Sequence, residues 1–233
     1  MSRVFLQAQW RKLIMANYEI DPAILTPYLP YGTELDTWQG RHYVSLVGFM
    51  FQDTKVLGVK IPWHVNFEEV NLRFYVKRGE KRGVVFIKEI VPRIAITLVA
   101  NTLYKEHYAT RRMKHEWVED QHSLRVRYEW KERMGWQYMQ VEADPLGTEL
   151  VAGSEEEFIT EHFWGYTRKS AHKTGEYEVA HPAWQIHSVR DFELQMDVNQ
   201  VYGSQFEASF SEVPKSVFLA QGSEIKVFQG SGI

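Results

Sequence analysis

The sequence contains no cysteine among its 233 residues. This absence excludes disulfide bonds, thiolate-ligated zinc, iron–sulfur clusters and a cysteine nucleophile. The chain also lacks the metal-ligand spacing HExxH, the glycine-rich loops that bind phosphate groups and the GxSxG context of a serine nucleophile. We therefore expect no metal and no other cofactor.

Long apolar runs and a large net charge are missing as well. No run approaches the roughly 18 apolar residues of a membrane span. Polar residues interrupt the N-terminal stretch where a signal peptide needs a continuous apolar region: Gln7, Gln9, Arg11 and Lys12. The net charge of −3 is too small to recruit nucleic acid or anionic lipid. We expect a soluble cytoplasmic protein without nucleic-acid or membrane partners.

Short alternating segments dominate the chain, without a low-complexity linker or an internal repeat, and this favours a single domain over residues 1–233. The almost continuously apolar segment Arg41–Phe51 predicts a central strand covered on both faces. A meander of three strands is predicted where polar turns join alternating segments: Arg111–Val118, Ser123–Trp130 and Trp136–Ala143.

Helical signals are few and short. Asp21 followed by Pro22 is typical of a helix start, and Ser154 with the three following glutamates resembles a capping box. Asp197–Gly203 is a further candidate helix, whereas Pro92–Tyr104 fits a helix or a strand. We predict a β-rich α+β fold: a largely antiparallel sheet, closed or folded over itself, with a few short helices.

The strand predicted over Asn66–Lys77 has two unlike faces. Its even positions are apolar throughout: Val70, Leu72, Phe74 and Val76. Its odd positions carry the polar residues Glu69, Asn71 and Arg73, followed by Tyr75. Two interpretations stay open: a polar interior pocket in which the arginine clamps a carboxylate, or a solvated strand face with a weak ion pair.

Two other segments carry reactive or aromatic side chains. Lys105, His107 and Tyr108 have the functional groups for proton transfer or amine chemistry, but such residues also crowd exposed loops. A second segment places four side chains on one strand face, which fits a pocket wall or the packing of an edge strand: His162, Trp164, Tyr166 and Arg168.

The succession of motifs resembles the YqjF-like family of uncharacterised bacterial proteins, placed in the acetoacetate decarboxylase-like superfamily. The resemblance is specific over about residues 8–115 and weaker to the end. It rests on Trp10, Asp21–Leu25, Leu29–Gly32, Leu35–Thr37, Gly40–Arg41, Tyr43–Val47, Asn66–Val76 and Gly83–Phe86. The resemblance implies a cone-like closed β-barrel with an interior ligand site.

The superfamily's decarboxylases use a lysine that forms a Schiff base with a β-keto acid, next to a second lysine that lowers its pKa. Their motif of a tyrosine, a proline and two lysines has its nearest match at Tyr104–His107, where Lys105 replaces the proline and Glu106 and His107 replace the lysines. An arginine expected near Tyr18 is missing, and only the family's glutamate has a clear counterpart, at Glu69. The resemblance supports the fold and a pocket more than the decarboxylase chemistry.

Our leading hypothesis is a small-molecule-binding protein whose interior cavity takes an organic carboxylate or carbonyl compound. Glu69 and Arg73 would orient the ligand, and the pocket wall would include Asn71, Tyr75, His107 and Tyr108. Whether the protein is an enzyme stays open: the rival is a lyase or decarboxylase of altered mechanism, with Lys105 as the amine or His107 as acid or base. A third alternative is a structural or assembly module with a plugged barrel, and self-association is a weaker expectation.

The aromatic residues, 14% of the chain, have a place in this interpretation. We predict that several of them fill the closed barrel on its alternating faces: Tyr43, Phe49, Phe51, Phe74, Phe86, Tyr128 and Trp130.

Overall fold

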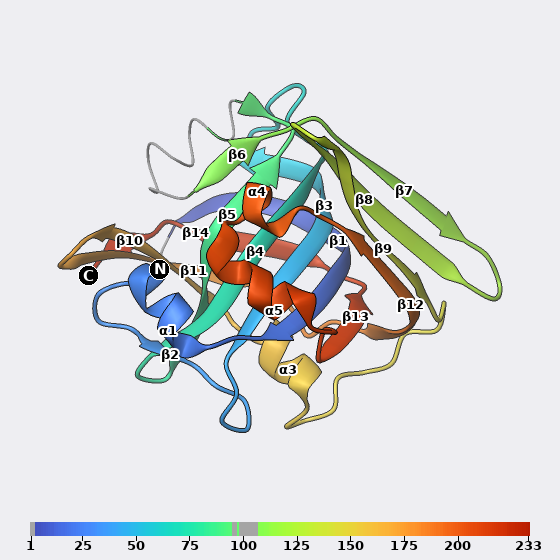
Figure 1. Cartoon of the computed structure of the whole chain (residues 1–233). Helices are drawn as coiled ribbons and strands as arrows, with labels where there is room; N and C mark the ends of the chain where they lie inside the picture. Colours follow the sequence, from blue (N-terminus) through green and yellow to red (C-terminus); the bar gives the residue numbers. More distant parts are fainter. Residues whose placement is uncertain (1–2, 95–96, 98–106) are drawn as a thin grey trace.

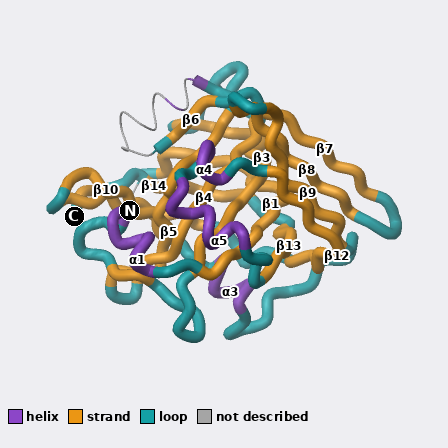
Figure 2. Tube along the Cα trace, viewed as in Figure 1, coloured by secondary structure: helices purple, strands orange, loops and turns teal. Residues whose placement is uncertain are grey.

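The computed structural model of the chain describes residues 3–94, 97 and 107–233. Strands dominate it, as Figures 1 and 2 show. The first half contains β1 (Val4–Glu19), β2 (Glu34–Leu35), β3 (Tyr43–Val56), β4 (Phe67–Arg78), β5 (Lys81–Val91), β6 (Tyr108–Thr110) and β7 (Met113–Glu119). The second half contains β8 (Leu124–Glu132), β9 (Gly135–Ala143), β10 (Trp164–Ser170), β11 (Lys173–Ala180), β12 (Ile186–Gln195), β13 (Ser216–Ala220), β14 (Glu224–Phe228) and β15 (Ser231–Gly232).

Seven strands pair into a closed ring in the order β14-β11-β10-β5-β4-β3-β1, because β1 pairs with β14 as well as with β3. The length of β1 makes this closure possible. Its first half pairs with β14 and its second half with β13, and its register with β3 shifts between Arg11 and Ile14. Lys12, with a φ of 53°, lies at that irregularity, where such a bulge bends the strand.

The sheet continues beyond β1 through β13 and β12 into β9, β8 and β7, which flare to one side of the ring in Figure 1. The predicted meander is confirmed: β7 pairs with β8, and β8 with β9, both antiparallel. The inward side chains of β8 are completely buried against the outside of the ring: Leu124, Val126, Tyr128 and Trp130.

The predicted short helices are present. α1 (Pro22–Leu25) begins after Asp21, whose side chain accepts a hydrogen bond from the Ala23 amide at 2.8 Å. α3 (Glu155–Thr160) is capped by the Ser154 hydroxyl, and α4 (Val198–Val201) by Asp197. The chain also forms two short 3₁₀ helices, η1 (Thr26–Tyr28) and η3 (Ser204–Phe206), and a further α-helix, α5 (Glu207–Ser211). The predicted Pro92–Tyr104 element lies mostly outside the described residues.

Two apolar clusters lie on the two sides of the ring. The outer cluster joins the outward faces of β1, β3, β4 and β5 to β8, β9 and the C-terminal helices, with Val70, Leu72 and Phe74 at its centre. α4 and α5 cross this outer side in Figure 1. The inner cluster lies inside the ring and includes Phe49 and Phe67. β4 therefore supplies both clusters from alternate positions, as period two requires.

The predicted β-rich α+β class with a sheet closed on itself is confirmed. Two details differ from the prediction. The strand expected over Arg41–Phe51 begins at Tyr43 and extends to Val56, and two short pairings, β10 with β5 and β5 with β6, are parallel. None of the helices in the described ranges has the length and apolar character that crossing a membrane requires.

Candidate functional site

A pocket of about 300 Å³ lies inside the ring, and all seven ring strands contribute residues to its lining. We distinguish two parts of this lining. The polar wall consists of Glu69, Asn71, Arg73, Glu89, Tyr108 and His162. The aromatic wall consists of Trp10, Phe49, Phe51, Phe67 and Trp184.

The polar positions of β4 are buried in this lining. Glu69, Asn71 and Arg73 are exposed by only 3%, 2% and 8% of their surface. The alternative of a solvated strand face is therefore wrong for this strand, because the ring closes over its polar side. The amide nitrogen Nδ2 of Asn71 donates a hydrogen bond to Oε1 of Glu69 at 2.9 Å.

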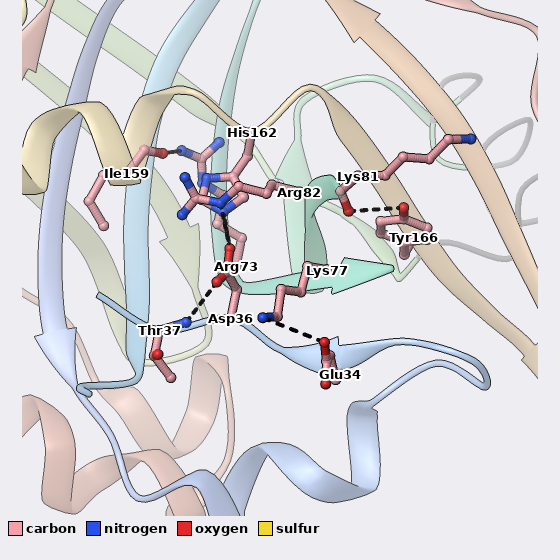
Figure 3. A network of polar contacts seen from close by, with 10 residues as sticks. All are labelled: Glu34, Asp36, Thr37, Arg73, Lys77, Lys81, Arg82, Ile159, His162 and Tyr166. Carbon is pink, nitrogen blue, oxygen red and sulfur yellow. Dashed lines mark hydrogen bonds and ion pairs between the residues drawn. The ribbon is translucent and has the colours of Figure 1, made fainter. Parts of the chain in front are cut away.

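Arg73 brings a permanent positive charge into the pocket. Its Nη2 donates a hydrogen bond to the carbonyl oxygen of Ile159 in α3 at 3.1 Å, as Figure 3 shows. Its Nε is buried without a hydrogen-bond partner in the described part of the chain. The guanidinium carbon lies 5.7 Å from the centre of the Tyr75 ring. Among the described residues, a neutral carbonyl oxygen is thus the hydrogen-bond acceptor of this buried cation, and hydrogen-bonding capacity is left for an anion.

A bulge in β5 gives the pocket a second buried carboxylate, Glu89. Asn71 pairs with Glu89 and Leu72 with Lys88, but Arg73 pairs with Phe86, so Ile87 is the extra residue. Because a bulge reverses the alternation, Phe86 and Glu89 both line the pocket, whereas the amino group of Lys88 contacts the Val201 carbonyl oxygen on the other side. The sequence analysis missed Glu89.

Tyr108 of β6 lies beside Glu89, its partner in the parallel pairing. Burial raises the pKa of the Tyr108 hydroxyl well above its ordinary value, and the negative charges of Glu69 and Glu89 raise it further. The phenol is therefore protonated at neutral pH. Tyr108, a predicted site residue, does line the pocket.

His162 forms the end of the polar wall together with Asp36, which lies outside the pocket lining (Figure 3). Its Nε2 lies 3.3 Å from Oδ2 of Asp36, and the same oxygen accepts a hydrogen bond from Nε of Arg82 at 2.7 Å. Burial raises the pKa of Asp36, but the hydrogen bonds from His162 and Arg82 outweigh this effect and lower it to about 2. Asp36 is therefore an ionised acceptor at neutral pH.

This carboxylate determines the state of the imidazole. Burial lowers the pKa of His162 to about 4 in spite of the hydrogen bond to Asp36, so the ring is neutral near pH 7. Because Asp36 can only accept, Nε2 must carry the proton, and Nδ1 keeps its lone pair. Nδ1 has no hydrogen-bond partner among the described residues.

Not all predicted site residues line the pocket. Tyr75 is buried beside it, where its hydroxyl lies 2.5 Å from the Ser45 hydroxyl, and it is not among the lining residues. His107 is exposed and likewise outside the pocket lining, and its carbonyl oxygen accepts a hydrogen bond from the Glu89 amide. Lys105 lies outside the described residues.

The stripe predicted at His162, Trp164, Tyr166 and Arg168 is divided in the structure. His162 precedes β10, and it lines the pocket together with Trp164. Tyr166 is buried in the outer cluster. Arg168 is exposed and donates to the Pro27 carbonyl oxygen at 2.5 Å. The stripe is therefore partly pocket wall and partly packing.

The aromatic wall is a set of rings in contact. Trp10 meets Phe49, Phe51 and Trp184 edge to face, with ring centres 5.4, 5.9 and 6.2 Å apart. Phe51 stacks on Phe67 at 4.6 Å. The prediction that aromatic residues fill the interior needs correction here: Phe49, Phe51 and Phe86 line the pocket, and the fully buried Phe74, Tyr128 and Trp130 pack in the outer cluster.

The polar wall mixes carboxylates, a guanidinium and an imidazole, and these groups do not converge as metal ligands do. In the part of the chain that the structure describes, no three His, Asp or Glu side chains are grouped closely enough to hold a metal ion. The arrangement instead offers donors and acceptors to an organic ligand.

Solved structures define the class of this fold. An enduracididine biosynthesis enzyme, MppR, complexed with pyruvate superposes with a TM-score of 0.68 at 12% identity, over 99% of this chain and 91% of that one. Acetoacetate decarboxylase from Legionella pneumophila also has a TM-score of 0.68 at 12% identity, over 98% and 87% of the two chains. These likenesses show the fold alone, which is acetoacetate decarboxylase-like.

The family is narrower than the fold. DUF2071, described as an uncharacterized conserved protein, matches residues 7–224, and the chain belongs to this family. A relative, the uncharacterized protein YqjF of Bacillus subtilis (strain 168), is 30% identical over 112 residues. That alignment spans 48% of this chain and 46% of YqjF, about half of each. The resemblance inferred from the sequence motifs is confirmed.

Proposed function

We propose that this protein binds a small organic carboxylate, including compounds that also carry a carbonyl group, in the pocket inside the ring. The observation that carries the proposal is Arg73. Its buried guanidinium lines the pocket, and its protein hydrogen bond goes to a backbone carbonyl oxygen. A ligand carboxylate would accept the charge-assisted hydrogen bonds that the guanidinium can still give.

Other parts of the polar wall support the same ligand chemistry. The amide nitrogen of Asn71 gives one hydrogen to Glu69 and has a second hydrogen that a carbonyl or carboxylate oxygen can accept. MppR, which shares the fold, has been solved in complex with pyruvate, a carboxylate with an adjacent carbonyl group. The identity of 12% makes that complex a guide to ligand chemistry only.

The two alternatives have less support. A plugged interior would leave no open space beside Glu69, whereas this residue lines a pocket of about 300 Å³. The lyase alternative relies on His107 as acid or base, which is exposed and outside the pocket lining, or on Lys105 as the amine, which lies outside the described residues. Borohydride trapping with pyruvate followed by mass spectrometry separates binding from amine catalysis, because only a Schiff base leaves an adduct on a lysine.

The test of the proposal is the affinity of the Arg73→Met variant for pyruvate, measured by calorimetry. Loss of a hydrogen-bonded charge in a buried site weakens binding by roughly tenfold or more. Arg168→Met is the matched control, because this exposed arginine lies outside the pocket. Arg73→Gln also removes the charge and serves if Arg73→Met does not fold. Unchanged affinity in a folded Arg73 variant would refute the proposal.

A further inference from the structure

The pocket is larger than a two- or three-carbon carboxylate needs. Its volume of about 300 Å³ reaches the lower end of the range of about 300–1,000 Å³ that holds drug-sized ligands. Pyruvate bound at Arg73 would leave the aromatic wall in contact with empty space or water. An aromatic wall beside an open space favours a ligand with an apolar part.

The sheet register places the polar and aromatic walls in sequence along one direction. On β4 and β3, the paired positions run from Arg73–Ser45 through Asn71–Val47 and Glu69–Phe49 to Phe67–Phe51. At about 3.3 Å per residue, the aromatic wall begins about 13 Å along β4 from Arg73, at the Glu69–Phe49 pair.

At the end of the pocket away from Arg73, the lining consists mainly of aromatic rings. Trp10 presents edge-to-face geometry to Phe49, Phe51 and Trp184. Aromatic rings prefer such edge and offset contacts, and a further ring gains from them beyond the area that it buries. An aliphatic patch formed by Leu6, Val179 and Val227 closes the pocket from neighbouring strands.

We infer that the ligand is a monocarboxylate that carries an aromatic ring at the end opposite its carboxyl group. Its carboxylate binds at Arg73, and its ring lies against Trp10, Phe49 and Phe51. This inference rests on the proposed function, which supplies the carboxylate end, and adds the class of the other end.

The experiment compares four probes by calorimetry: pyruvate, 3-phenylpyruvate, octanoate and the uncharged 2-phenylethanol. Because its phenyl ring would be buried, 3-phenylpyruvate is expected to bind at least about tenfold more tightly than pyruvate. Octanoate should bind more weakly than 3-phenylpyruvate. Equal affinities of pyruvate and 3-phenylpyruvate would refute the inference of an aromatic tail and would leave the proposed carboxylate site unaffected. Tighter binding of octanoate than of 3-phenylpyruvate would show that the pocket prefers an aliphatic chain to a ring.

A graded pair of variants, Val227→Leu and Val227→Phe, tests the location of the tail. Val227 lines the pocket away from Arg73, between Leu6 and Val179, so larger side chains there should weaken 3-phenylpyruvate progressively and leave pyruvate unchanged. Val217→Phe is the matched control, since this half-buried valine on β13 packs on the outer cluster. Equal effects of Val227→Phe and Val217→Phe would overturn the placement, and Val227→Leu keeps the test valid if the larger residue prevents folding.

The probes also separate this inference from the proposed function. If 2-phenylethanol binds as tightly as 3-phenylpyruvate and Arg73→Met changes neither affinity, the site at Arg73 is wrong and both proposals fall. If the Arg73 variant weakens pyruvate and 3-phenylpyruvate equally but the ring gives no gain, only the aromatic tail is wrong.

Discussion

The outer and inner sides of the ring differ in how completely they are packed. On the outer side, Val70, Leu72 and Phe74 are fully buried between the ring, β8, β9 and the C-terminal helices. On the inner side, Trp10 and Phe86 are only partly buried, because they line the pocket. The same sheet thus has one face that is a close-packed core and another that surrounds a space.

This difference shows how one strand divides its tasks. Alternate residues of β4 point to opposite sides, so Leu72 packs in the outer cluster while Asn71 and Arg73 line the pocket. Truncating a side chain is expected to destabilise the protein more on the outer side, because a removed methylene leaves a void in a close-packed core. The inner side includes two buried carboxylates and a buried guanidinium, and removing these groups from water costs free energy.

The largest expected effect comes from truncating matched phenylalanines on the two sides. Phe74→Ala should lower the free energy of unfolding by about 3–5 kcal/mol, because a fully buried ring leaves a cavity. Phe86→Ala should cost about 1–2 kcal/mol, since its ring already faces the pocket. Urea denaturation measures both. Equal losses would mean that the pocket closes and that the two sides are packed alike.

A second difference between the sides is expected in their response to acid. The pKa of His162 falls from 6.5 to about 4 on folding, so the unfolded chain binds more protons between these values and stability falls as the pH drops from 6.5 towards 4. The contribution is at most about 3 kcal/mol. Above pH 6.5 this contribution is complete and independent of pH.

His162→Gln should remove this pH dependence, as urea denaturation at pH 7, 5.5 and 4.5 would show. His122→Gln is the control, because this histidine is exposed. Asp36 does not confuse the result, since its pKa is lowered to about 2 and its titration lies below this window. An unchanged slope in His162→Gln would show that the imidazole is already protonated in the folded protein.

The alternation of β4 made the division of its side chains predictable from sequence. Period two places Glu69, Asn71 and Arg73 together and opposite to Leu72 and Phe74, and the structure shows this arrangement. Period two does not say which side faces solvent. That depends on the closure of the ring by β14 and β1, which are more than 200 residues apart in the chain at the paired positions Gln7 and Lys226.

Other parts of the site could not be found from local pattern. Strict alternation along β5 puts Lys88 beside Phe86, and only the bulge at Ile87 turns Glu89 into the pocket instead. Asp36 and His162 are 126 positions apart and meet through tertiary packing. Whether an aromatic residue fills an interior or lines it depends on the summed volumes of all neighbours, which a single strand does not reveal.

A third comparison of the two sides comes from adding one methyl group on each. At Gly48 of β3, a Cβ atom would lie 2.7 Å from Sδ of Met139 in the outer cluster. At Gly165 of β10, it would overlap the side chain of Tyr177, whose ring lines the pocket. Each alanine variant should lower the free energy of unfolding by about 1–3 kcal/mol, because overpacking forces neighbours to move.

Ligand affinity should distinguish these two glycine variants. In Gly165→Ala the Tyr177 ring must move and alter the pocket wall, so the affinity for 3-phenylpyruvate should fall several-fold, whereas Gly48→Ala should leave it unchanged. Thermal melts with and without the ligand measure both quantities on the same samples. An equal loss of affinity in Gly48→Ala would mean that strain in the outer cluster is transmitted across the sheet to the pocket. Packing on the outer side and ligand binding on the inner side would then not be independent.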